Sequence, residues 1–204
     1  MIKIVDYGLG NVLAFLNVYR RLNIPTSVAK SAADLVGATQ IILPGVGSFD
    51  HAMERFSSSG MREPLEDLVL GKKVPILGIC VGMQMLANSS EEGYLPGLGW
   101  IDGVVRKLSN PGCSTQLQLP HMGWNDLENF EPSGLFLGFK EAPRFYFLHS
   151  YYFDCASQDS VLAESRYGEK FACAVGSNNV YGVQFHPEKS HQNGMDLLKN
   201  FSET

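Results

Sequence analysis

The sequence predicts an α/β fold: a mostly parallel sheet covered by helices on both faces, with additional antiparallel strands in the C-terminal half. Two features indicate this fold. Short apolar runs alternate with helical patterns up to residue 87, which is typical of parallel sheets built from strand–helix–strand units. Beyond residue 87, strand-like runs follow one another across turn-rich joints such as 110–112, which favours antiparallel pairing.

In the first half, each predicted strand is short and apolar, and a helical pattern follows it. The predicted strands are Ile2–Val5, Thr26–Ala29, Gln40–Leu43 and Val74–Cys80. The predicted helices are Val12–Leu22, Ala32–Val36, His51–Ser57, Met61–Leu70 and Met83–Ala87. Ligands bind at the carboxyl ends of the strands in such sheets, so we expect the functional site there.

In the second half, strand patterns dominate and the joints contain turn residues. The predicted strands are Trp100–Leu108, Thr115–Leu119, Arg144–Phe153, Val161–Tyr167, Phe171–Val175 and Val180–Phe185, and Met195–Phe201 is a closing helix. The residues 168–170 predict a hairpin, and the polar, acidic stretch 89–93 predicts a solvated loop. Because we find neither an internal repeat nor a linker, residues 1–204 are predicted to form a single domain.

The composition is that of an ordinary soluble protein and argues against several function classes. Hydrophobic residues make up 45% and charged residues 18% of the 204 residues, and the net charge is −5. Positive charges gather no further than pairs such as Arg20–Arg21, so we expect no nucleic-acid partner. No apolar run approaches the roughly 18 residues of a membrane span, and no signal pattern opens the chain. We therefore expect no membrane association and a cytoplasmic location.

The four cysteines are far apart in the sequence: Cys80, Cys113, Cys155 and Cys173. None belongs to a Cys-x-x-Cys pair, so the sequence predicts neither a metal site nor a redox pair. Reduced thiols are the expectation in the cytosol, and a disulfide between Cys155 and Cys173 is not expected.

Cys80 stands where an apolar strand gives way to a helical pattern, with Gly78 two residues before it and Gly82 two residues after. This is the glycine–x–nucleophile–x–glycine spacing of a nucleophile elbow, with cysteine as the nucleophile. Glycine at both flanks removes the Cβ atoms that would clash in so tight a turn. The turn places sulfur at a helix N-terminus, which favours the reactive thiolate. A buried strand that contains a cysteine is the alternative interpretation.

A catalytic cysteine needs a base, and His186 is the best of five histidines. His51 and His191 lie among polar residues and are expected to be exposed, which leaves His121, His149 and His186. His186 stands out because it ends an apolar strand and Pro187 follows it. Glu188 follows two residues later, and in an extended backbone such residues project to the same side. Its carboxylate could orient the imidazole as the third member of a catalytic triad does. By itself this short string fits a structural histidine equally well.

Two glycine-rich loops follow predicted strands in the first half. Gly8 and Gly10 suggest a dinucleotide site, but Leu13 occupies the third glycine position and the acid expected further along is absent, so no cofactor is predicted. Asn11 is expected to begin or cap the next helix. The loop Gly45–Val46–Gly47 exposes backbone N–H groups that suit an anion or a developing oxyanion, although such a loop is often a simple turn.

Two of these stretches together resemble the class I (triad) glutamine amidotransferases: 78–84 around Cys80, and 182–188 around His186. Further motifs resemble the glutaminase subunits of imidazole glycerol phosphate synthase within that family: 5–11, 44–49, 121–125, 149–152 and 186–190. The similarity runs from Ile2 to the closing helix, with no departure at a triad position. It implies a three-layer, flavodoxin-like fold.

The resemblance also implies what the residues do. Cys80, His186 and Glu188 would form a triad that hydrolyses L-glutamine through a thioester. Backbone N–H groups of Val81 and of the loop with Val46 and Gly47 would hold the oxyanion. The residues implied around the substrate are Gln84, Glu92, Ser150 and Tyr151. Those implied to face a partner are Asn11, Trp124, Tyr146 and Lys189.

The implied partner is a separate (β/α)8-barrel cyclase, because 204 residues are too few for this domain and a barrel of about 250 residues. The cyclase would use the ammonia to make imidazole glycerol phosphate and aminoimidazole carboxamide ribotide in histidine biosynthesis. We also predict that the Gly45–Gly47 loop turns its donor toward the site only when the cyclase has bound its nucleotide.

Other functions remain open at this point. The chain could be the glutaminase subunit of another synthase, such as pyridoxal phosphate synthase, or a cysteine hydrolase that acts on peptides. A different class altogether is a catalytically silent binding subunit with the same fold. The intact set of Cys80, His186 and Glu188 argues against the silent subunit.

Overall fold

The main sheet is parallel in one half and mostly antiparallel in the other. A computed structural model describes residues 1–110, 117–140 and 142–204. The strand order is β2-β1-β3-β4-β13-β12-β10-β6-β5, and the stretch from β2 to β13 is parallel. Its strands are β1 (Ile2–Val5), β2 (Thr26–Ala29), β3 (Gln40–Gly45), β4 (Ile76–Cys80) and β13 (Val180–Val183). The order of these five strands is flavodoxin-like, which confirms the predicted fold class.

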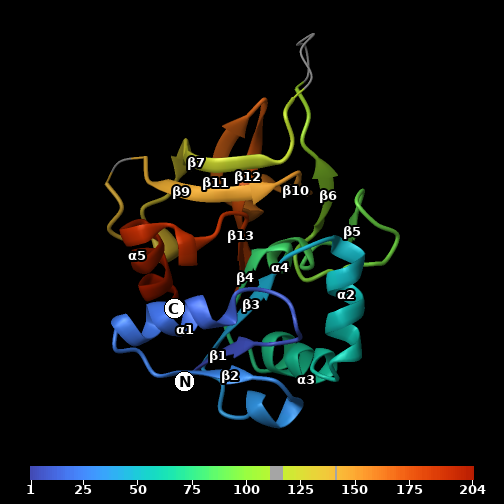
Figure 1. The fold of residues 1–204 in the computed structure, drawn as a ribbon, viewed down its shortest axis with the longest axis vertical. Helices are drawn as coiled ribbons and strands as arrows, with labels where there is room; N and C mark the ends of the chain where they lie inside the picture. The colour runs from blue at the N-terminus through green and yellow to red at the C-terminus, as the bar shows by residue number, and fades with distance from the viewer. Residues whose placement is uncertain (111–116, 141) are drawn as a thin grey trace.

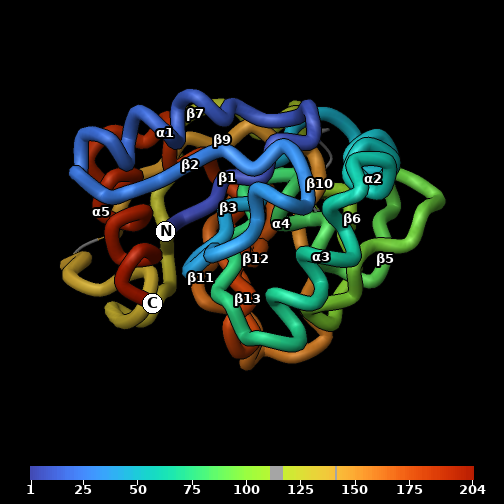
Figure 2. Tube along the Cα trace, turned by 90° about the horizontal axis from the view of Figure 1, so that it is seen from below, coloured from blue at the N-terminus to red at the C-terminus, as the bar shows by residue number. Residues whose placement is uncertain are grey.

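Helices cover both faces of the parallel half. In Figures 1 and 2, α1 and α5 lie on one side of β3 and β4, while α2 and α3 lie on the other. The helices are α1 (Val12–Arg21), α2 (Phe49–Ser58), α3 (Arg62–Glu66), α4 (Val81–Gln84) and α5 (His191–Ser202). A 3₁₀ turn, η1 (Ala32–Leu35), follows β2, and a π-helical turn, η2 (Asp67–Gly71), continues α3. No helix in the described ranges is long and apolar enough to cross a membrane.

The mostly antiparallel half continues the sheet beyond β13, and a smaller sheet lies beside it (Figure 1). Its strands are β5 (Ser89–Ser90), β6 (Gly103–Lys107), β8 (Asn129–Phe130), β10 (Tyr151–Cys155), β11 (Val161–Tyr167) and β12 (Glu169–Ser177). Among them, β5 pairs with β6 in parallel, and the other pairings are antiparallel. The smaller sheet pairs β7 (His121–Asp126) with β9 (Arg144–His149). The 3₁₀ turns are η3 (Gly134–Phe136), η4 (Gln158–Ser160) and η5 (Pro187–Lys189). The hairpin predicted at 168–170 is present between β11 and β12.

One predicted strand, Arg144–Phe153, is wrong as a single element. The chain breaks at Ser150, so that β9 pairs with β7 while β10 pairs with β6 and β12. The physical reason is local, because His149 Nδ1 is 2.8 Å from the carbonyl oxygen of Tyr151, a contact that spans the break. A side chain that bonds to the backbone two residues on competes with a continuous strand.

Three further predicted elements need correction. The strand Trp100–Leu108 is confined to β6, because Trp100 and Ile101 pack into the core from a turn. Of the predicted strand 115–119, residues 115 and 116 lie outside the described residues and 117–119 are not a strand. The stretch 89–93 is not simply solvated, since Ser90 is buried and pairs with Val105.

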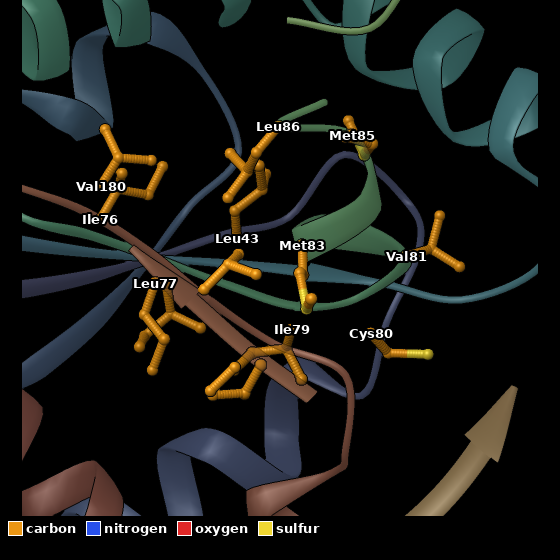
Figure 3. Close-up of a cluster of buried hydrophobic side chains, with 14 of the residues drawn as sticks. Leu43, Ile76, Leu77, Ile79, Cys80, Val81, Met83, Met85, Leu86 and Val180 are labelled. Carbon is orange, nitrogen blue, oxygen red and sulfur yellow. The ribbon is translucent and has the colours of Figure 1, made fainter. Parts of the chain in front are cut away.

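An apolar layer beneath α4 supports the turn at Cys80. Leu43 and Met83 lie in this layer, whereas Ile79 projects from the other face of the sheet and the Cys80 side chain points away from the cluster (Figure 3). The predicted helix Met83–Ala87 is wrong in its bounds, because α4 begins at Val81 and ends at Gln84. The chain then tightens into a turn in which Leu86 N–H donates to the Met83 carbonyl oxygen. The helix therefore starts directly after the cysteine, as an elbow requires.

Candidate active site

Cys80 adopts a backbone conformation that residues other than glycine rarely adopt. Its φ is 55° and its ψ is −113°, at the junction of β4 and α4. Strain of this kind costs about 1–3 kcal/mol and gathers at functional sites. A Cβ on Gly78 would lie 2.6 Å from the carbonyl oxygen of Gly82, and one on Gly82 would collide with the carbonyl oxygen of Leu43. Both flanking positions therefore require glycine, which is the physical reason for the observed spacing.

The register of three parallel strands brings the site residues to one level. Gly45 at the end of β3 is paired with Cys80 at the end of β4. On the other side, Val183 at the end of β13 is paired with Ile79. Gln184 thus follows next to Cys80, and His186 lies two residues beyond. The glycine loop, the cysteine and the histidine meet at the carboxyl edge of the sheet, as the sequence predicts.

His186 is held between a carboxylate and the cysteine. Its Nδ1 is 2.9 Å from Glu188 Oε1, and the two side chains are 5% and 2% exposed. Burial lowers the pKa of His186, but hydrogen bonds to the Cys80 sulfur and to Glu188 outweigh burial and raise the pKa to about 10. The second Glu188 oxygen is buried and has no hydrogen-bond partner within the described chain. A carboxylate placed in this way favours the imidazolium form of its neighbour.

His149 also lines the site, but its surroundings keep it neutral. Its Nδ1 lies 2.8 Å from the carbonyl oxygen of Tyr151, so Nδ1–H donates there, and Nε2 is left to accept from His121 Nδ1 at 3.0 Å. Burial lowers the pKa of His149 to about 3 and that of His121 to about 4. Asn125 lies 3.3 Å from the remaining nitrogen of His121. With both nitrogens engaged, His149 has no free acceptor with which to take a proton from sulfur.

A cavity of about 310 Å³ opens beside Cys80. It brings together the predicted nucleophile, base, oxyanion loop and substrate residues. Its lining consists of Val46, Gly47, Cys80, Val81, Gln84, Glu92, Pro120, Leu148, His149, Ser150, Tyr151, His186 and Lys189. Glu188 lies behind His186 and does not line the cavity. No group of three or more His, Cys, Asp or Glu side chains suited to a metal ion occurs among the residues described.

Two polar side chains that line the cavity are held in place by hydrogen bonds. Glu92 Oε2 accepts the N–H of Phe49, the first residue of α2, at 2.8 Å. Gln84 donates to the carbonyl oxygen of Tyr151 at 3.1 Å and to Gln184 Oε1 at 3.0 Å. Pre-positioned side chains of this kind suit a small polar ligand.

The residues predicted to face a partner fall into two places. Trp124 is 43% exposed, and its ring centroid lies 6.1 Å from that of Tyr146. Lys189 Nζ lies 5.6 Å from the centre of the Tyr146 ring and also lines the cavity, so it joins this aromatic cluster to the site. Asn11 is the N-cap of α1, where it accepts the N–H of Ala14 at 3.3 Å. His191, which is exposed as predicted, stacks on Trp124.

Sequence reasoning assigned no role to four residues that the fold brings to the site. Pro120, Leu148 and His149 line the cavity, and Gln184 donates to the Cys80 sulfur at 3.7 Å. The signal for Gln184 was a polar residue at the end of an apolar strand. Cys80, Cys155 and Cys173 are all free thiols, while Cys113 lies outside the described residues.

Comparison with known proteins decides the family. The model of the class-I glutamine amidotransferase family matches residues 3–204. The chain belongs to this family. It is 65% identical to the imidazole glycerol phosphate synthase subunit HisH of Bdellovibrio bacteriovorus, and the match covers the whole length of both chains. It is 50% identical to HisH of Leptospira interrogans over 202 residues, 99% of each chain.

Within the class I amidotransferases, the chain therefore belongs to the HisH family, whose members are named subunits of imidazole glycerol phosphate synthase. This confirms the predicted family and enzyme class over the other synthases that the sequence left open. The crystal structure of a glutamine amidotransferase from Thermotoga maritima shares the fold, with a TM-score of 0.65. At 17% identity, over 99% of this chain and 82% of that one, the likeness concerns the fold alone.

Proposed function

We propose that the chain hydrolyses L-glutamine with Cys80 as nucleophile, His186 as general base and acid, and Glu188 as the group that orients His186. One observation carries the proposal: the buried series Glu188–His186–Cys80 opens onto a cavity whose wall holds the carboxylate of Glu92. A silent binding subunit would not need a strained cysteine beside an imidazole with so high a pKa.

The first half-reaction forms a thioester and releases ammonia. With its proton on His186, the Cys80 sulfur attacks the side-chain amide carbon of glutamine. The C–N bond of the tetrahedral intermediate then breaks, and the His186 imidazolium gives its proton to the departing nitrogen. Base catalysis of this kind contributes about a hundred- to ten-thousand-fold in rate.

Backbone N–H groups stabilise the negative oxygen of that intermediate. Val81 begins α4 directly after the nucleophile, and Val46 and Gly47 line the cavity from the end of β3. Removing one such donor typically costs about a hundred- to a thousand-fold in kcat. Water then attacks the thioester with help from His186, and glutamate leaves.

Glu92 and Gln84 would hold the amino-acid end of the substrate, together with Ser150 and Tyr151. Glu92 offers a carboxylate for the α-ammonium group of glutamine. The break between β9 and β10 directs Ser150 and Tyr151 into the same cavity. No cofactor is required for this chemistry.

Ammonia would pass to a separate (β/α)8-barrel cyclase, and together the chains would form a heterodimer. The HisH relatives are called subunits of imidazole glycerol phosphate synthase and have the length of this chain. The cluster of Trp124, Tyr146 and Lys189 is a suitable docking surface, because it is partly exposed and Lys189 reaches the cavity. Asn11, at the start of α1, would form a second contact with the cyclase. A single domain in the cytoplasm is consistent with this role.

The test measures glutamate release from glutamine by the chain alone, with the cyclase, and with the cyclase plus its ribotide nucleotide. Cys80→Ala is the blank. Release that vanishes in the blank is expected. If no mixture releases glutamate, labelling of Cys80 by a reactive glutamine analogue decides: labelling would indicate a wrong partner, whereas no release together with no labelling would overturn the proposal.

The same assay tests the regulation of the oxyanion loop. Gly47 has a φ of +92°, and no described atom lies within 4 Å of the position its Cβ would take. The loop therefore has room to rotate its peptide groups when the partner is activated. We expect slow hydrolysis by the isolated chain, and a full rate without the cyclase would contradict this regulation.

A further inference from the structure

A buried amide, Gln184, lies against the nucleophile. Its side chain is fully buried, and its Nε2 lies 3.7 Å from the Cys80 sulfur, within hydrogen-bond reach of so large an atom. Parallel pairing of β13 with β4 sets this position, because Val183 is opposite Ile79 and the next residue falls beside Cys80. The contact thus follows from the register of the sheet rather than from a mobile loop.

The neighbours of Gln184 determine which end of the amide faces the sulfur. Gln84 Nε2 lies 3.0 Å from Gln184 Oε1, and the same nitrogen lies 3.1 Å from the carbonyl oxygen of Tyr151. A nitrogen that contacts a carbonyl oxygen must be a donor, so Gln184 Oε1 accepts from Gln84. The Gln184 NH₂ group is then left to donate to Cys80. The amide is oriented as a donor by contacts outside the nucleophile itself.

We propose that Gln184 is a further catalytic residue of this site, whose side-chain N–H stabilises the Cys80 thiolate. The proposal rests on the function proposed above. His186 and Gln184 then act in different ways on one sulfur atom. His186 exchanges a proton with it, whereas an amide cannot exchange a proton in this pH range and so acts as a fixed donor.

The donor matters at the two points where sulfur carries negative charge. It favours the thiolate over the thiol, whose S–H points instead toward the carbonyl oxygen of Leu148, 3.8 Å from the sulfur. It also stabilises the thiolate as it leaves when water breaks the thioester. Hydrogen bonds to ionised groups are about twice as strong as neutral ones. Its removal should therefore reduce the thiolate population.

The experiment follows alkylation of Cys80 by iodoacetamide as a function of pH, with the labelled peptide quantified by mass spectrometry. Peptide analysis separates Cys80 from the other thiols; burial raises the pKa of Cys155 to about 12 and that of Cys173 well above its usual value. The variants are Gln184→Met, which keeps the length without the donor, and Gln184→Asn, which withdraws the amide from the sulfur. Gln40→Met is the matched control, because Gln40 is the first residue of β3 and therefore lies at the amino ends of the parallel strands, whereas Cys80 lies at their carboxyl ends.

We expect the midpoint of the alkylation profile to rise by about one pH unit in both Gln184 variants. At pH values below the midpoint, a rise of one unit means that alkylation is tenfold slower, which corresponds to about 1.4 kcal/mol in the free energy of thiol ionisation. The midpoint in Gln40→Met should equal that of the unaltered chain. An unchanged midpoint in either Gln184 variant that retains its thermal transition would overturn the proposal. Because alkylation needs no glutamine, a failure of the glutaminase function would not affect this result.

Discussion

The carboxylate of Glu92 accepts a hydrogen bond from the backbone N–H of Phe49, at 2.8 Å. Phe49 begins α2, and the loop containing Val46 and Gly47 comes directly before that helix. One carboxylate therefore both offers a charge to the cavity and fixes the helix end that follows the oxyanion loop. These two roles can be separated by mutation.

Replacing Glu92 by glutamine should weaken substrate binding while leaving stability nearly unchanged. An amide oxygen can still accept from Phe49 N–H, but the charge that pairs with an ammonium group is lost. A hydrogen bond to a charged group contributes about 1.5–3 kcal/mol, so we expect KM for glutamine to rise roughly ten- to a hundredfold. Glu92→Ala should show the same rise and also lose about 1 kcal/mol of stability, because the helix end loses its cap. Equal KM values in Glu92→Gln and the unaltered chain would show that Glu92 does not bind the substrate.

Replacing Glu188 by glutamine should lower the pKa of His186 from about 10, because a neutral amide no longer favours the imidazolium. Glutamate release should fall by about a hundredfold or more, since both the orientation and the charge of His186 change. Glu203→Gln is the matched control: Glu203 is an exposed carboxylate with its own partner, Lys199, at 4.0 Å. Steady-state rates with the cyclase present measure both. Activity of Glu188→Gln within a factor of about two of the control would rule out the role of Glu188.

The strained backbone at Cys80 should make glycine more stabilising there than alanine. Cys80→Ala retains a Cβ at a φ of 55°, whereas Cys80→Gly removes it. We expect the glycine variant to exceed the alanine variant by about 1 kcal/mol in free energy of unfolding, measured by urea denaturation. Ala33→Gly, at an exposed position of η1, is the control and should be destabilising. A glycine variant at position 80 that is less stable than the alanine variant would mean that no strain is stored at the elbow.

The histidine pair His121–His149 should make stability fall on the acidic side of neutrality. Their pKa values in the folded state are lowered to about 4 and about 3 from 6.5, so the unfolded chain binds protons first as the pH drops. Their contribution is therefore complete above pH 6.5 and declines toward pH 4 and below. At about 1.4 kcal/mol per pH unit for each group, the loss should amount to several kcal/mol by pH 4.

The contribution of His186 to stability changes with pH in the opposite direction. Its pKa is raised to about 10, so its contribution is present below pH 6.5 and is lost as the pH rises toward 10.

Denaturation curves of His121→Phe, in which the new ring can still stack on Tyr167, test the predicted loss of stability at acidic pH. The fall in stability between pH 6.5 and 4 should shrink by roughly 1–3 kcal/mol in this variant. An unchanged fall would show that the pair is not the origin of the acid sensitivity.

Several features of the fold and the site were predictable because neighbours in sequence decide them. The elbow needs glycine within two residues of Cys80, where a Cβ would meet backbone atoms. Glu188 reaches His186 because only two residues separate them. The alternation of strands and helices likewise predicts the parallel half of the sheet, since each strand and its crossover helix are consecutive.

Contacts between distant residues followed a different rule. Arg144–Phe153 has the pattern of a single strand, but its two parts pair with different strands: β9 pairs with β7, and β10 pairs with β6 and β12. The stretch 89–93 has the composition of a solvated loop, yet Glu92 is drawn to the helix end at Phe49. The composition of a segment gives its polarity, but it does not identify the group with which a polar side chain forms its hydrogen bond.

Spacings of a few residues are enough to predict the α/β class and to propose Cys80 as nucleophile, His186 as its base and Glu188 as the acid behind that base. The tertiary structure alone decided that Gln184 donates to Cys80, that His149 is engaged by His121, and that Lys189 joins the aromatic cluster to the cavity. These contacts join residues that are distant in sequence or lie on different elements. Strand register and side-chain packing set them, and no local pattern encodes either.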